Sequence, residues 1–63
     1  MQRTPVITVI LSTTQAWAYA QFLKRVGLSD YAGLAANVDE AYEMLAAGEA
    51  IRQELRQAGY EPR

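Results

Sequence analysis

The sequence contains no cysteine and no histidine, which removes the side chains that carry most protein chemistry. Without cysteine there is no disulfide and no thiolate site. Nucleophilic catalysis needs a base beside the nucleophile, usually histidine, and zinc sites draw on cysteine, histidine and carboxylates. The glycine-rich phosphate loops and the spacing of a calcium loop are also missing. We therefore predict a protein that is not an enzyme and that holds neither a cofactor nor a metal.

The chain also lacks a strong charge of either sign and a long apolar run. Its net charge is -1, whereas proteins that bind nucleic acid by neutralising phosphates usually carry a clear basic excess. The longest apolar stretch, Pro5 to Leu11, is interrupted by Thr8 and is well short of the roughly 18 residues of a membrane span. These absences predict a cytoplasmic protein that does not enter membranes and that is unlike a phosphate-driven nucleic-acid binder.

What is present is a short chain with a high apolar content. Its 63 residues, 51% of them hydrophobic, form one predicted domain, residues 1–63. A domain of this length buries only about 60% of the surface of its unfolded chain. Apolar packing, or association with a second copy, must therefore supply the stability that no disulfide provides.

The segment from Val6 to Leu11 is rich in β-branched residues and predicts a strand. Ile7, Val9 and Leu11 would lie on one side of it, and Val6, Thr8 and Ile10 on the other. A single strand leaves its backbone groups unpaired. We therefore expect it to pair either with the tail around Tyr60 or with a second copy of the chain, which leaves a homodimer open.

Three helices are predicted after the strand. Ser12 and Gln15 have the spacing of a capping box, and Gly27 is a natural left-handed end for the helix that they begin. Ser29 begins a short second helix that continues through Ala36.

The third helix begins at Asn37, with Glu40 placed for a second capping box, and Gly59 ends it. The fold class is thus α+β, with one N-terminal strand and then a long, a short and a long helix. The residues predicted to face inward are Ala16, Tyr19, Ala20, Leu23 and Val26 in the first helix and Ala41, Met44, Leu45, Gly48, Ile51, Leu55 and Ala58 in the third.

Acidic side chains gather along the third helix and form one candidate binding surface. Glu40, Glu43 and Glu54 fall on one side of it. Carboxylates three residues apart on a helix lie near the spacing of successive phosphates, which suits a DNA mimic. The ordinary interpretation, which we weigh more heavily, is that acids in a first turn complement the helix dipole on a solvated face.

Two aromatic residues are the other candidates for partner binding. Trp17 lies beside the inner stripe of the first helix, and Tyr42 lies off the inner face of the third. Half-exposed tryptophans and tyrosines are typical anchors of protein interfaces. The alternative is that both pack against their own chain.

The run Ile7 to Leu11, followed by a helix, Gly27-Leu28-Ser29 and another helix, resembles the first half of a ribbon-helix-helix repressor. The resemblance implies a strand-paired dimer that reads DNA from its outward strand side chains. Here those side chains would be Val6, Thr8 and Ile10, with no arginine, lysine, asparagine or glutamine to read bases.

Five short motifs stand out along the chain: Gln15-Ala16-Trp17-Ala18, Phe22-Leu23-Lys24-Arg25-Val26-Gly27, Ser29-Asp30-Tyr31, Asp39-Glu40-Ala41-Tyr42 and Ala58-Gly59-Tyr60. Through these motifs, residues 6–63 are similar to a family of uncharacterised proteins on phages and mobile elements of Pseudomonas and its relatives, some of which look like anti-CRISPR proteins of type I-C. The resemblance implies an inhibitor that binds a Cas subunit of the Cascade complex and blocks target DNA.

The leading prediction is therefore an anti-CRISPR inhibitor that works by binding a Cas protein in the host cytoplasm. Its candidate contact residues are Glu40, Glu43, Glu54, Tyr42 and Trp17. The alternatives are a dimeric DNA-binding regulator of the ribbon-helix-helix kind and an antitoxin-like or scaffold module.

Overall fold

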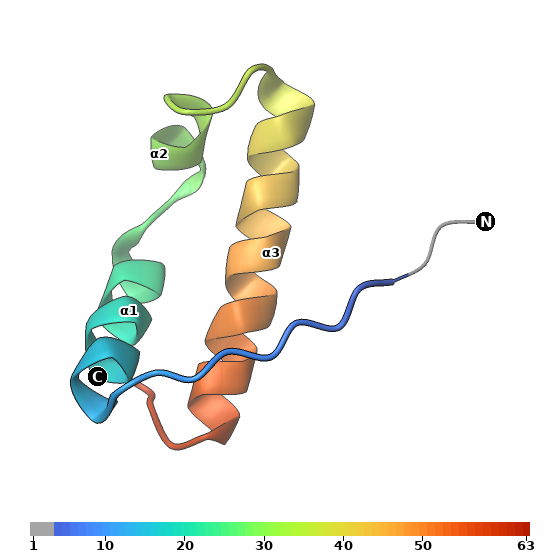
Figure 1. Cartoon of the computed structure of the whole chain (residues 1–63). Coiled ribbons are helices and arrows are strands. Elements are labelled where there is room, and N and C mark those ends of the chain that lie inside the picture. Colours follow the sequence, from blue (N-terminus) through green and yellow to red (C-terminus); the bar gives the residue numbers. More distant parts are fainter. Residues whose placement is uncertain (1–3) are drawn as a thin grey trace.

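The structure, a computed structural model, describes residues 4–63 and contains three helices (Figure 1). They are α1 (Thr13–Arg25), α2 (Leu28–Ala32) and α3 (Val38–Gln57). The chain rises through α1 and α2, turns, and descends through α3, so that α3 packs against both of the other helices. None of the helices in this part of the chain is both long and apolar enough to cross a membrane.

The predicted N-terminal strand is wrong, and with it the α+β fold class. Residues 4–12 are drawn out but belong to no helix or strand, and the described chain is helical without a sheet. The physical reason is that a strand needs a hydrogen-bonded neighbour, and the tail around Tyr60 does not supply one. Tyr60 instead donates its backbone N–H to the carbonyl of Leu55. The β-branched residues thus favour an extended backbone, but a ladder also needs a second segment.

The predicted start of α1 is confirmed. The hydroxyl of Ser12 accepts a hydrogen bond from the Gln15 N–H at 3.0 Å, and the Gln15 side chain accepts one from the Ser12 N–H. The predicted left-handed end at Gly27 is wrong, because this residue has an extended backbone with φ −124 and ψ 178. Gly27 is the N-cap of α2 instead, and its N–H donates to the Asp30 carboxylate at 2.9 Å. The N-cap of the short helix is therefore two residues before the predicted cap Ser29, and the helix ends at Ala32, well before the predicted Ala36.

The third helix begins and ends where the sequence predicts. The Asn37 side chain accepts from the Glu40 N–H, while the Glu40 carboxylate accepts from Ala36 rather than from Asn37. At the other end Gly59 has φ 102, a left-handed conformation that glycine adopts without strain. The Gly59 and Tyr60 N–H groups bond back to Arg56 and Leu55, which is the Schellman pattern.

The interior is small and is made mostly of small residues. We name the buried residues of α1 and α3 the helix seam: Ala16, Ala20, Leu23, Ala41, Gly48 and Leu55. Val26 and Tyr60 pack against its edge. The molecule measures 33 × 31 × 15 Å, so it is little thicker than one layer of helices, each about 10–12 Å across.

Candidate functional site

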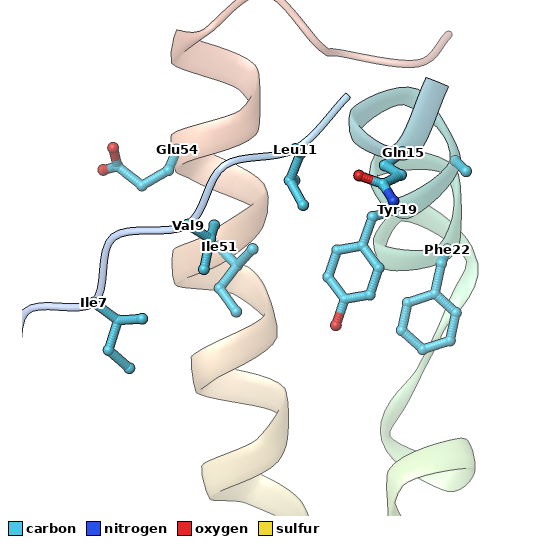
Figure 2. A pocket seen from close by; sticks show the side chains of 9 residues that line it. Ile7, Val9, Leu11, Gln15, Tyr19, Phe22, Ile51 and Glu54 are labelled. Atoms are coloured by element: carbon cyan, nitrogen blue, oxygen red, sulfur yellow. The ribbon is translucent and has the colours of Figure 1, made fainter. Parts of the chain in front are cut away.

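The extended N-terminal segment, α1 and α3 border an open groove that is lined mainly by apolar side chains (Figure 2). Its volume is about 790 Å³. We name it the apolar groove, and its residues are Ile7, Val9, Leu11, Gln15, Ala18, Tyr19, Phe22, Ile51 and Glu54. The N-terminal segment and α1, which follow each other in sequence, therefore form one surface with the distant helix α3.

The N-terminal segment contributes alternate residues to the groove. Ile7, Val9 and Leu11 line it, whereas Val6 and Ile10 point away and are 92% and 96% exposed. The two-sided alternation predicted for this segment is thus present, although the strand is not. The segment presents apolar side chains on both of its sides.

The side of α1 that faces the groove is aromatic. Tyr19 and Phe22 stack with ring centroids 5.4 Å apart. Phe22 nevertheless remains 48% exposed. Tyr19 was predicted to face inward, and this prediction is wrong because the narrow seam with α3 accepts only the small faces of Ala16 and Ala20.

The wall from α3 consists of Ile51 and Glu54. Ile51 was also predicted to face inward, but it is 46% exposed, because it lies at the edge of the helix stripe that meets α1. Glu54 is exposed, so its carboxylate remains in water while the neighbouring apolar atoms line the hollow. The arrangement of an apolar centre with a polar rim is typical of protein–protein interfaces.

The acidic candidates do not act as one unit. Glu40 accepts the Ala36 N–H at 3.0 Å, so its carboxylate already has a structural role in capping α3. Glu43 is exposed, and Glu54 belongs to the rim of the groove. At about 100° per residue, Glu43 and Glu54 lie on the same side of α3, about three turns apart.

The aromatic candidates lie away from the groove. The ring of Trp17 meets that of Tyr60 edge to face at 5.1 Å, and Trp17 is still 42% exposed. It lies on the opposite flank of α1 from Tyr19. Tyr42 is exposed, roughly 160° around α3 from Glu40, so the structure separates it from the acidic side.

Sequence reasoning missed Tyr19, Phe22 and Ile51 as surface residues. The available signal was that α1 is apolar on several sides, with Trp17 and Phe22 outside the stripe that was assigned to the interior. A helix that is apolar around much of its circumference needs more than one neighbour.

One titratable group near the groove is perturbed. Burial raises the pKa of the Tyr31 phenol above its usual 10.0, and Tyr19 and Glu49 raise it further because each is negative when ionised. Within residues 4–63, no cluster of three or more acidic, histidine or cysteine side chains is placed to hold a metal ion.

Comparison with known sequences identifies a family. The description "Family of unknown function (DUF7706)" fits residues 1–63, the whole of the sequence. The chain belongs to this family. No curated protein and no solved structure matches it.

Proposed function

We propose that this chain is a binding protein without chemistry of its own, which docks on another polypeptide through the apolar groove. The observation that carries this proposal is the exposure of large apolar side chains from three separate segments on one hollow surface, such as Val9, Phe22 and Ile51. Contiguous apolar surface with a polar rim usually marks a site of protein interaction. A stacked aromatic pair, such as the one on the α1 side of the groove, is the kind of anchor that contributes most to binding.

Co-purification of the tagged chain from the cells that produce it tests this proposal. The wild type should capture its partner in stoichiometric amount. That partner can be a different polypeptide or an untagged copy of the same chain. Phe22→Glu should abolish capture, because a charge in the groove would have to lose its water on docking. Tyr42→Glu is the matched control, because Tyr42 is an equally exposed aromatic residue outside the groove.

Capture that survives Phe22→Glu unchanged would remove the groove from the account. So would the absence of any captured polypeptide, the chain itself included.

A narrower form of the proposal is an anti-CRISPR inhibitor that binds a Cas subunit of a type I-C Cascade complex. It is supported by the resemblance of residues 6–63 to such proteins and by the exposed carboxylates of Glu43 and Glu54 on one side of α3. Glu40 is a weaker contact candidate than Glu43 or Glu54, because its carboxylate accepts the Ala36 N–H at the start of α3.

Binding of purified protein to type I-C Cascade, followed by a target-DNA gel shift, tests the narrower form. The wild type should block DNA binding, and the double variant Glu43→Lys with Glu54→Lys should not. Glu49→Lys is the control, because Glu49 is exposed on another side of α3. Failure to bind Cascade would end this form of the proposal and leave the general one standing.

The DNA-binding regulator has less support. Along the N-terminal segment, Val6, Thr8 and Ile10 are exposed and do not line the groove, and none of them is an arginine, lysine, asparagine or glutamine. A gel shift on the gene's own promoter region at low salt would test it directly.

A further inference from the structure

We propose that the occupant of the apolar groove is a second copy of this chain, and that the protein is a two-fold symmetric homodimer. The inference rests on the proposed docking role of the groove and names the partner. The contact would centre on Val9, Phe22 and Ile51 of both copies.

The first argument is the number of layers. Stable domains bury apolar faces between at least two packed layers of secondary structure. This chain is only 15 Å thick in its shortest dimension, and its Cα radius of gyration is 12.9 Å. A compact domain of this length would have a radius of gyration of about 10.6 Å. The chain thus has the dimensions of one layer, and a second copy laid on the groove would supply the other.

The second argument is the accessible area. The chain exposes 5377 Å² at a mass of 7.0 kDa. A folded monomer of this mass exposes about 4,000 Å². The excess of about 1,300 Å² exceeds the roughly 800 Å² that each partner buries in a stable interface of standard size. Covering the groove and the N-terminal segment can therefore bring the chain to the area expected of a folded protein.

The third argument is that the small interior of one copy gives it only marginal stability. The buried hydrophobic residues are three alanines and two leucines, and no large side chain is completely buried in the part of the chain that is described. There is no cysteine for a disulfide. Small chains without such staples commonly obtain their stability from oligomerisation. A partner present only at certain times would leave this need unmet, whereas a second copy is present whenever the chain is made.

The fourth argument is that the grooves of two copies can lie against each other without repulsion. A two-fold interface brings the same patch of both copies together, so a strongly charged patch would repel itself. Among the residues that line the groove, the only acidic side chain is Glu54, which stays exposed at the rim, and none is basic. The apolar centre is therefore compatible with a copy of itself.

The N-terminal segment extends this surface beyond its own helices. It passes α3 and projects away from the helices, as Figure 1 shows, and Val6 and Ile10 are almost fully exposed. No backbone hydrogen bond joins residues 4–11 to any other described residue. The second copy is placed to cover these side chains and to offer partners to these backbone groups, which would otherwise stay in water.

Sedimentation equilibrium of the purified full chain tests the inference, at protein concentrations from about 1 to 100 μM. The wild type should have the mass of two chains at the upper concentrations. Phe22→Glu and Ile51→Glu should each lower the mass to that of one chain, and circular dichroism would follow their helix content. Tyr42→Glu carries the same kind of change on an aromatic residue outside the groove and should remain dimeric.

Three results would overturn the inference: a wild type with the mass of one chain throughout, a dimer that survives both groove variants, or a dimer that Tyr42→Glu alone dissociates. A monomeric wild type that still captures a different polypeptide in a Phe22-dependent manner would refute the homodimer and leave the docking function intact. Without self-association and without such capture, both proposals fail.

Discussion

The helix seam and the apolar groove reverse the usual distribution of side chains. The seam buries mostly small residues, including Ala16, Ala20 and Gly48. The groove leaves large ones accessible, including Phe22 and Ile51. Small residues let two helices approach closely, but they remove little apolar area from water. The seam therefore determines how the helices are arranged, whereas the groove holds most of the apolar surface that can still be buried.

The sharpest way to break this comparison is to truncate neighbouring residues of α1. Leu23 lies in the seam and is buried, and Leu23→Ala should lower the free energy of unfolding by about 2–5 kcal/mol because it leaves a cavity. Phe22→Ala should cost less than about 1 kcal/mol in dilute protein, where its exposed ring has little to lose. Urea unfolding followed by circular dichroism measures both. Equal costs in dilute protein would mean that groove and seam do not differ.

Adding bulk to the seam is the second test. A Cβ atom at Gly48 would meet the hydroxyl of Tyr31 and lie 3.5 Å from Leu23 Cδ2. Gly48→Leu should therefore push α1 and α2 away from α3 and cost about 1–3 kcal/mol of stability. Ala46→Leu puts the same side chain on an exposed position of α3 and should be nearly neutral. A neutral Gly48→Leu would show that the seam is loosely packed.

Ser12 connects the N-terminal segment, which lines the groove, to α1, which carries residues of the seam. Ser12→Ala removes the hydroxyl that accepts the Gln15 N–H and should cost about 1 kcal/mol. Thr14 is the second residue of the same helix, and Thr14→Ala should change stability by less than about 0.5 kcal/mol. Thermal unfolding at one fixed protein concentration compares the two. A larger loss in Thr14→Ala would contradict the capping assignment.

The smallest effect is expected from the titration of Tyr31. Its pKa is raised in the folded chain, chiefly by burial, so the folded state holds the proton more tightly than the unfolded state. Its contribution to stability is complete below pH 10, the ordinary pKa, and is lost as the pH rises through the raised value. Tyr31→Phe should flatten this alkaline decrease in urea unfolding curves measured from pH 9 upward. An unchanged alkaline slope would assign the loss to other groups.

Local signals in the sequence predicted the start of α1 and both ends of α3. Ser12 with Gln15, Asn37 with Glu40, and Gly59 act over three or four residues, and such short-range contacts determine where α1 and α3 begin and where α3 ends. Gly27 was assigned wrongly because a glycine after a helix also fits the N-cap of the next helix. Both positions suit a residue without a side chain.

The wrong predictions concern contacts between distant parts of the chain, which the local sequence pattern does not specify. The segment from Val6 to Leu11 has strand-forming residues and alternates as a strand does, but no other segment within residues 4–63 forms a backbone ladder with it. Tyr19 and Ile51 have helical spacing, yet one helix pair is too narrow to cover them. The five predicted contact residues were chosen for charge and aromaticity, and only Glu54 belongs to the groove.

The central claim is that the groove is covered in solution by another copy of the chain. The most direct test is the midpoint of urea unfolding at two protein concentrations a hundredfold apart. A dimer that dissociates on unfolding gains about 2.7 kcal/mol from that increase by mass action, so the midpoint should move to higher urea. Phe22→Glu should remove the dependence. A wild-type midpoint that is the same at both concentrations would contradict the account.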